Sequence, residues 1–202
     1  QCGPIRHRID LDHSEEQSRT VFVREFSLRL PAGKDRLPIH QIWEHLIQSR
    51  DRNSAIASDV TSAFEEQRFC ALLSDRKEHL NVLESLLRER LPEDAVFRMD
   101  GSTPRKQREE ALNHLRLKAA QCLPFVLLAT ASLLGEGFDM PELDTLFLAM
   151  PISFKGRLIQ YAGRLHRISE KKKSVQIYDY AEPDHPLTAQ MYRKRSVAYR
   201  EM

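Results

Sequence analysis

From residue 69 onward, short apolar runs alternate with stretches of helical periodicity, and this alternation most constrains the fold. The apolar run Phe69–Leu73 precedes the amphipathic stretch Arg76–Arg90, which places leucines on one helix face. The same order recurs at Ala95–Met99 and Pro104–Leu117, at Phe125–Ala129 and 133–134, at Thr145–Ala149 and Lys155–Leu165, and at Ser174–Tyr180 with a polar helix from about Leu187. Because the strands are apolar throughout, we predict an α/β fold whose parallel sheet is covered by helices on both faces.

The first 67 residues follow a different pattern. Two β-rich stretches, Pro4–Asp10 and Thr20–Leu30, could pair as a hairpin, and helical stretches follow near Ile39–Ile47 and Ser54–Gln67. We therefore predict an N-terminal extension over residues 1–67 that packs on a core domain over residues 68–202. The chain opens on Gln1 within strand-like sequence, which suggests a domain cut from a longer protein.

Composition excludes several classes of protein. The formal charge of +2 is too balanced to indicate nucleic-acid or membrane binding by itself, so any basic surface must be local. No apolar run reaches the roughly 20 residues of a membrane helix, and no signal peptide opens the chain. Cys2, Cys70 and Cys122 lie far apart, which favours reduced packing residues and a cytoplasmic location without membrane contact. The eight histidines have no metal-ligand spacing, so no metal site is predicted.

The predicted strands end in segments that suit a polar ligand. An open parallel sheet binds ligands at the carboxyl ends of its strands. Here these ends contain small residues, hydroxyl groups and charges, the composition expected where the backbone approaches such a ligand. The segments are Ser74-Asp75-Arg76, Asp100-Gly101-Ser102, Thr130-Ala131-Ser132 and Met150-Pro151.

Two further segments carry candidate chemistry. Gln160-Tyr-Ala-Gly163-Arg164-Leu-His-Arg167 places two arginines three residues apart, and their forked, permanent charge suits a transferring phosphoryl group. The other segment holds Gly135, Gly137 and Asp139 directly after an apolar strand. Taken singly, the first is also compatible with a solvated helix face and the second with a glycine turn capped by aspartate.

Together, and in this order, these segments resemble the C-terminal RecA-like domain of superfamily 2 helicases and translocases. The resemblance covers approximately Arg68 to Tyr180. Ser74-Asp75-Arg76 falls at motif IV, Asp100-Gly101-Ser102 at motif IVa, Thr130–Asp139 at motif V and Gln160–Arg167 at motif VI. Motif V is one residue longer than in DEAD-box proteins and resembles the excision-repair branch.

The resemblance implies a role for each matching residue. Arg164 and Arg167 correspond to arginine fingers that reach ATP held by the other RecA-like domain. Four further residues are implied at the ATP site, namely Gly137, Asp139, Gln160 and Gly163. The nucleic-acid contacts implied are Ser74, Arg76, Gly101, Ser102, and Thr130 or Ser132.

The sequence lacks two parts that ATP hydrolysis needs. It contains no Gly-x-x-x-x-Gly-Lys-Ser/Thr loop and no Asp-Glu-x-x box. We therefore expect ATP and Mg²⁺ to be bound mainly by an N-terminal RecA-like motor domain of the same protein, and the isolated chain to be inactive.

We expect DNA rather than RNA as the polymer. The opening segment, Gly135–Asp139 and Tyr178-Asp-Tyr180 also resemble bacterial helicases of restriction or phage defence. Two alternatives stay open at this point: a helicase-like scaffold without motor function, and an unrelated α/β enzyme that uses Asp75 or Asp139 as a base.

Overall fold

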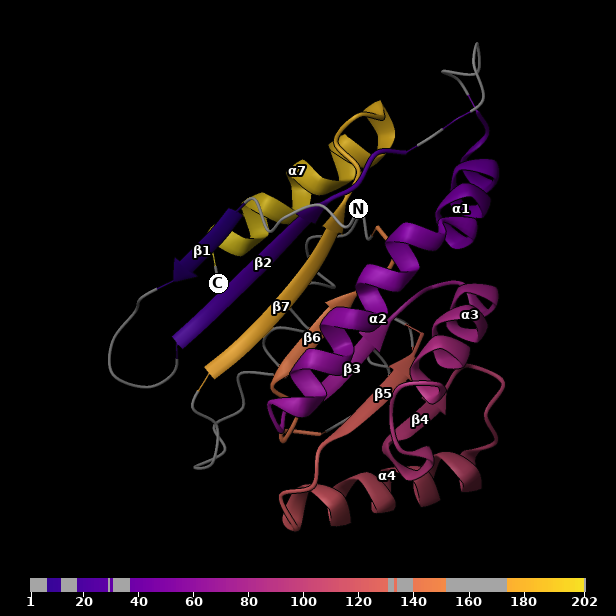
Figure 1. Ribbon diagram of the computed structural model, residues 1–202, viewed down its shortest axis with the longest axis vertical. Helices are drawn as coiled ribbons and strands as arrows, with labels where there is room; N and C mark the ends of the chain where they lie inside the picture. Colours follow the sequence, from indigo (N-terminus) through magenta and orange to yellow (C-terminus); the bar gives the residue numbers. More distant parts are fainter. Residues whose placement is uncertain are drawn as a thin grey trace.

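The computed structural model describes residues 7–11, 18–28, 30, 37–130, 133, 140–151 and 174–201. Within these residues one seven-stranded sheet runs in the order β1-β2-β7-β6-β3-β5-β4 (Figure 1). The strands are β1 (His7–Leu11), β2 (Ser18–Glu25), β3 (Phe69–Leu73), β4 (Val96–Met99), β5 (Phe125–Ala129), β6 (Thr145–Leu148) and β7 (Ser174–Ala181). The helices are α1 (Ile39–Gln48), α2 (Arg50–Glu65), α3 (Lys77–Arg88), the 3₁₀ turn η1 (Glu93–Ala95), α4 (Arg105–Ala120) and α7 (Pro186–Glu201).

The predicted hairpin is confirmed and forms part of the main sheet. β1 pairs antiparallel with β2, with His7 opposite Val23. β2 then runs parallel to β7, with Val21 opposite Ile177, and the remaining neighbours are also parallel. The segment 1–67 thus supplies two strands to the sheet of the α/β core, and β2 lies against the last strand of the chain.

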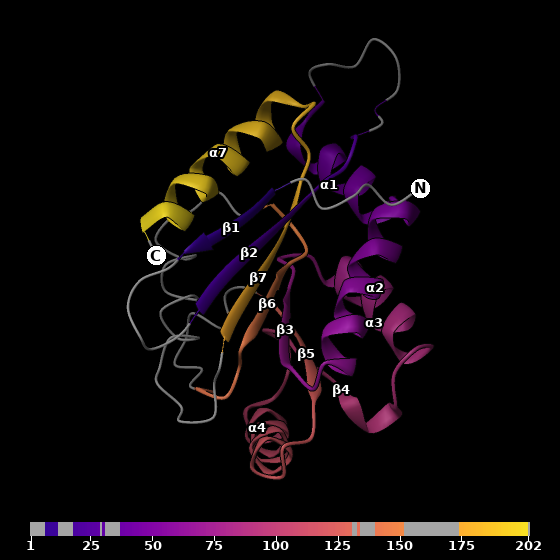
Figure 2. The ribbon, with the colours of Figure 1, turned by 60° about the vertical axis from the view of Figure 1, so that its left-hand side comes forward.

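Helices cover both faces of the sheet, as the apolar strands predict. In β3, Cys70 and Leu72 belong to the cluster that contains Ile56 of α2 and Leu80 of α3. Ala71 and Leu73 point the other way, into the cluster with Leu115 of α4 and Tyr199 of α7. Figure 2 shows α2 and α3 on one side of the sheet and α7 on the other. The two-sided burial explains why the strands lack a polar alternation.

The prediction that the cysteines pack in the interior is right for Cys70 and wrong for Cys122. Cys70 is a buried free thiol, whereas Cys122 is exposed. Cys122 follows α4 with a φ of 57°, and the Leu123 N–H donates to the Lys118 carbonyl at 2.9 Å. This is the left-handed position that ends a helix in a Schellman motif, so the residue lies at the surface. Cys2 lies outside the described residues.

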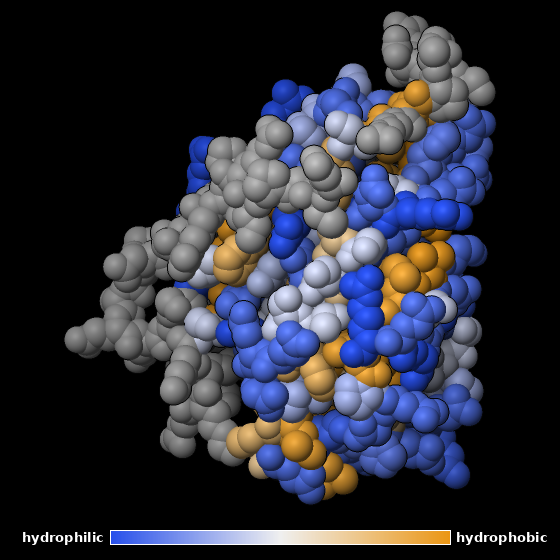
Figure 3. Space-filling view, in the orientation of Figure 1, coloured by the Kyte–Doolittle hydropathy of each residue, from blue (hydrophilic) through white to orange (hydrophobic). Residues whose placement is uncertain are grey.

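Among the described residues, the large apolar side chains that are exposed do not gather on one helix or strand. The exposed large apolar side chains lie on different elements: Ile39, Val82, Leu117, Leu123 and Val197. Figure 3 accordingly shows a mostly hydrophilic face with separate hydrophobic areas. Among the described helices none is both long and apolar enough to cross a membrane.

Candidate functional site

The carboxyl ends of β3, β5 and β4 bring three of the predicted segments together. These strands are neighbours in the sheet and parallel, so Ser74, Thr130 and Asp100 leave it at the same edge. The Ser74 N–H donates to the Ala129 carbonyl at 3.2 Å, which extends the ladder by one residue beyond β3. Thr130 lies between the other two loops, is buried, and accepts a hydrogen bond from the Leu133 N–H at its carbonyl.

The loop after β4 is held by its own aspartate. Asp100 Oδ1 accepts from the Ser102 N–H at 2.8 Å and from the Ser102 hydroxyl. The Asp100 N–H in turn donates to Thr103 Oγ1 at 2.9 Å, and the Thr103 N–H donates to the Asp100 carbonyl at 3.0 Å. These bonds fix the turn that leads into α4.

Gly101 lies at the open tip of this turn. A Cβ added there would meet no heavy atom within 4 Å. The glycine is therefore not required by packing inside the described part of the chain. It leaves free space in which a ligand can approach the backbone.

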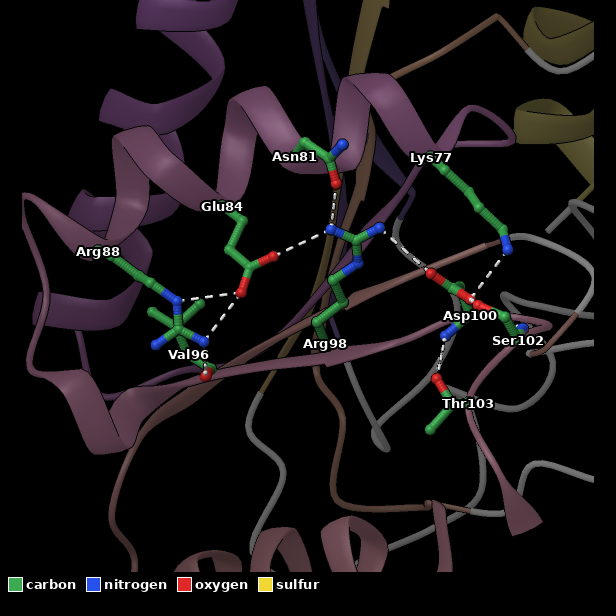
Figure 4. A network of polar contacts seen from close by, with 9 residues as sticks. All are labelled: Lys77, Asn81, Glu84, Arg88, Val96, Arg98, Asp100, Ser102 and Thr103. Carbon is green, nitrogen blue, oxygen red and sulfur yellow. Dashed lines mark hydrogen bonds and ion pairs between the residues drawn. The ribbon is translucent and has the colours of Figure 1, made fainter. Parts of the chain in front are cut away.

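Two cations converge on Asp100 (Figure 4). Lys77, at the start of α3, places Nζ 3.3 Å from Asp100 Oδ1, and Arg98 on β4 places Nη2 3.2 Å from Oδ2. The pKa of Asp100 is lowered well below its usual range, mainly by the Ser102 hydroxyl, although partial burial opposes the shift. Asp100 is thus ionised at neutral pH. It orients Lys77, whose side chain is 50% exposed, at the edge of the sheet.

Arg98 also joins this edge to the outer face of α3. It donates to Asn81 Oδ1 and, at 3.1 Å, to Glu84 Oε2. Glu84 Oε1 accepts from Arg88 Nη2 at 2.9 Å. Figure 4 shows this line of side chains along α3. The arginine therefore balances two carboxylates and leaves Lys77 as the more exposed cation of the cluster.

The loop after β3 combines a buried serine with an exposed arginine. Ser74 is 1% exposed, and its hydroxyl lies 3.1 Å from His79 Nδ1 while it accepts from the Arg76 N–H at 3.3 Å. Arg76 itself is exposed and directly precedes α3. The contact from Ser74 to nucleic acid stays a prediction, and the Ser74 hydroxyl is already engaged inside the protein.

The remaining predicted site residues cannot be placed. Arg164, Arg167, Gln160, Gly163, Gly137, Asp139 and Ser132 lie outside the described residues. These include every residue that the resemblance assigns to ATP.

Sequence reasoning missed a second polar cluster, at the start of α2. Arg52 donates from Nε to Glu182 Oε1 and from Nη1 to the Ala149 carbonyl, each at 2.7 Å. Burial raises the pKa of Glu182, and Arg52 opposes that shift. Asn53 lies 2.9 Å from His79 Nε2. Helical periodicity alone would place polar residues at the surface, and no spacing distinguished these two.

A cavity of about 540 Å³ borders the Arg52–Glu182 pair. It lies between the ends of β2 and β7 and the junction of α1 with α2, and its lining includes Phe26, His45 and Ser49. Arg52 Nη2 and Glu182 Oε2 have no hydrogen-bond partner within the part of the chain that the structure describes. Both atoms are shielded from solvent, so the cavity lies beside the ion pair without reaching them. Within the described residues no group of three or more metal-ligating side chains occurs.

Comparison with known proteins shows the family. The model of the helicase conserved C-terminal domain matches residues 55–169, more than half of the chain. The protein belongs to this family, and its α/β sheet is the RecA-like fold of superfamily 2 helicase C-terminal domains. No curated protein sequence matches the chain.

Solved structures share the fold at low identity. The C-terminal part of the Fun30 ATPase domain matches with a TM-score of 0.59 and 18% identity over 74% of this chain and 46% of that one. T4 UvsW matches with a TM-score of 0.60 and 14% identity over 80% and 32%. The helicase MrfA, bound to DNA and AMPPNP, matches with a TM-score of 0.60 and 11% identity over 90% and 23%. The chain thus spans less than half the length of each of these three.

Proposed function

We propose that this chain is the C-terminal motor domain of an ATP-dependent helicase or translocase. The observation that carries the proposal is the family match over residues 55–169, a range that includes the arginine motif Gln160–Arg167. The structural neighbour MrfA supports DNA as the polymer, because that helicase is described in complex with DNA and AMPPNP. A cytoplasmic location and a place in bacterial restriction or phage defence are parts of the same proposal and rest on the motif resemblances.

The arginine pair would act on ATP held by an N-terminal RecA-like domain. ATP, with Mg²⁺, supplies the phosphoryl group that is transferred to water. Arg164 and Arg167 would stabilise the charge that develops on that group, while Gly137, Asp139, Gln160 and Gly163 would shape the same cleft. The isolated chain would not hydrolyse ATP, because its sequence lacks the phosphate-binding loop and the Asp-Glu-x-x box.

The strand-end loops would hold the nucleic-acid backbone without reading its sequence. Arg76 and Lys77 are exposed at the end of β3, and Gly101 and Ser102 are exposed at the end of the nearby β4, where Ser102 already donates to Asp100. Phosphate groups are bound by such cations, hydroxyls and backbone N–H groups, and these contacts carry no sequence information. Thr130 or Ser132 would complete the track between them. Ser74 would act by holding the loop, since its hydroxyl faces His79.

The decisive experiment is the Arg164→Ala substitution in the full-length protein. Nucleic-acid-stimulated ATP hydrolysis should fall by about 10³-fold or more, as for other arginine fingers, whereas ATP binding should persist. Arg193→Ala, at an exposed position on α7, is the matched control and should leave hydrolysis unchanged. Normal turnover in the Arg164 variant would refute the motor assignment.

A salt titration tests the backbone contact separately. Arg76→Ala should weaken binding to single-stranded oligonucleotides of any sequence and reduce the slope of log K against log salt by about one. The control is Arg90→Ala, an exposed arginine beyond the far end of α3. Equal salt slopes for the Arg76 and Arg90 variants would remove Arg76 from the interface.

A further inference from the structure

The first turn of α2 carries two adjacent buried polar residues. Arg52 is 1% exposed and Asn53 is 2% exposed. Ordering and desolvating such side chains is costly unless every contact is used. The two residues contact different strand ends: Arg52 reaches β6 and β7, and Asn53 reaches β3 through His79.

The bonds of Asn53 have a defined direction. Its Nδ2 donates to the Ile47 carbonyl at 2.7 Å, which turns Oδ1 toward His79. His79 Nε2, 2.9 Å away, must then carry the ring proton. Burial lowers the pKa of His79 to about 3, so the ring is neutral and Nδ1 is an acceptor. The Ser74 hydroxyl lies 3.1 Å from Nδ1 and can donate to it, and the Arg76 carbonyl, 3.4 Å from Ser74 Oγ, is a second and longer acceptor for the same hydroxyl. The Ser74 oxygen consequently accepts from the Arg76 N–H.

This direction makes the chain of bonds a single unit. Asn53 and His79 each donate to one neighbour and accept from the other, so reversing the Asn53 amide would place two donors together at His79 and two acceptors together at Ile47. The unit runs from the end of α1, through α2 and α3, to the backbone of exposed Arg76. The position of the loop after β3 is therefore tied to the first turn of α2.

The bonds of Arg52 tie the same turn to the opposite half of the sheet edge. Its guanidinium joins the Ala149 carbonyl, just after β6, to the Glu182 carboxylate, just after β7. The guanidinium carbon also lies 5.8 Å from the centre of the Tyr180 ring. The chain continues from Ala149 toward the segment that carries Arg164 and Arg167.

We propose that Arg52 and Asn53 are positioning residues that couple the nucleic-acid loop after β3 to the loops after β6 and β7. This inference rests on the proposed function. A polymer bound at Arg76 restrains the Arg76 backbone, and the Ser74–His79–Asn53 unit passes that restraint to α2. Arg52 passes it on to Ala149 and Glu182. In this way bound nucleic acid would restrain the start of the segment that leads to the arginine motif, without contacting that segment.

The substitution Asn53→Leu in the full-length protein tests the coupling. Leucine has a similar size but cannot bond to Ile47 or His79. We expect the nucleic-acid-stimulated ATPase rate to fall about tenfold while the unstimulated rate stays within about twofold, because only the coupling free energy is lost. Asn113→Leu, the same change at an exposed position on α4, is the control and should retain full stimulation.

The outcomes separate the inference from the proposed function. Absence of nucleic-acid-stimulated ATPase in the unmodified protein would refute the proposed function. Stimulation in the unmodified protein that Asn53→Leu retains in full would refute only the coupling. Equal loss of stimulated and unstimulated rates in a folded Asn53→Leu variant would also refute it, since that result indicates a general structural role.

Amide hydrogen exchange on the unmodified full-length protein gives a readout that does not depend on the variant folding. Addition of a single-stranded oligothymidylate should slow exchange in residues 74–79 and also in residues 149–151 and 182–185. The last segment is the sharpest reporter, because no predicted nucleic-acid contact lies in it. Protection confined to residues 74–79 would overturn the proposal.

Discussion

Two regions of the molecule join an aspartate to an arginine but differ in burial. One is the carboxyl end of β4, called the open edge below, and the other is the interface between β7 and α7. At the open edge Asp100 shares its carboxylate with Arg98 and with half-exposed Lys77. At the interface Asp179 is fully buried and receives Arg195 Nε and Nη2, each at 2.9 Å, and the Tyr199 hydroxyl at 2.7 Å.

The difference shows how one chain uses the same chemistry for two purposes. The interface satisfies both oxygens of Asp179 from α7, which excludes any outside ligand and attaches the last helix to the last strand. The open edge leaves cations in contact with solvent, where a phosphate group can compete for them. Burial, rather than residue type, therefore separates the structural ion pairs from the candidate binding groups.

Arg195→Ala should have the largest effect on stability. It leaves a buried Asp179 carboxylate without its cation, which costs about 3–5 kcal/mol of unfolding free energy. Chemical denaturation of the chain measures this loss. Arg193→Ala, on an exposed position of the same helix, should change the value by less than about 0.5 kcal/mol. A loss below about 1 kcal/mol for Arg195→Ala would place the pair on a par with surface ion pairs.

Asp100→Asn should have a smaller effect, because Lys77 and Arg98 can return to solvent. Hydrogen bonds to charged groups are worth about 1.5–3 kcal/mol, and partial exposure at this edge favours the lower end, about 2 kcal/mol. The pKa of Asp100 is lowered by folding, so its contribution is present above its ordinary pKa of 3.8 and disappears as the pH falls through the lower folded pKa. Denaturation at pH 7 and at pH 2.5 measures how much of this contribution is lost, since pH 2.5 lies between the unfolded and the folded pKa of Asp100. A loss of 4 kcal/mol or more at pH 7 would show that the partly exposed contacts of Asp100 stabilise the fold as much as the buried contacts of Asp179 do.

His79 should make stability depend on pH in a different range. Its pKa is about 3 in the folded chain against an ordinary value of 6.5, so only the unfolded chain takes up a proton between these two pH values. The contribution of His79 to the unfolding free energy is therefore fully present above pH 6.5. It falls below that pH, by about 1.4 kcal/mol at pH 5.5. Asp59 and Glu182 have raised pKa values and act in the opposite direction. The difference between the unmodified chain and His79→Gln isolates His79; equal pH slopes would show that the ring is not buried neutral.

Gly101→Ala should have the smallest effect on stability and a visible one on binding. The added Cβ meets nothing in the chain, so the unfolding free energy should change by less than about 0.5 kcal/mol. Affinity for a single-stranded oligonucleotide should fall, because the methyl group occupies the space through which a phosphate reaches the backbone. Unchanged affinity in fluorescence anisotropy would show that the polymer does not approach this loop.

Much of the fold follows from local patterns. The apolar runs Phe69–Leu73 and Phe125–Ala129 are the central strands because a strand buried on both faces has no polar alternation. The motif order also placed the loops at Ser74, Gly101 and Thr130 on one edge, as the parallel strands confirm. These are properties of short segments and of the general geometry of parallel sheets.

Long-range partners were not predictable from those patterns. The parallel pairing of β2 with β7 joins residues about 150 positions apart, and nothing in the sequence of either strand indicates which strand it pairs with. The burial of Arg52, Asn53 and His79 likewise depends on groups on other elements. Cys122 was misassigned because its exposure results from a left-handed backbone at the end of α4, which favours glycine and has no reliable signal in a cysteine.

The pairing of β2 with β7 also determines where the sheet can be cut without exposing a central strand. A fragment trimmed to the family match at 55–169 would lose β1, β2, β7 and α7. Strand β6, whose four residues are all buried, would then become an edge with unpaired N–H and carbonyl groups. Bare apolar edges of this kind recruit strands from other molecules and lead to aggregation. Strands β1 and β2 thus protect the helicase C-terminal domain by completing its sheet together with β7.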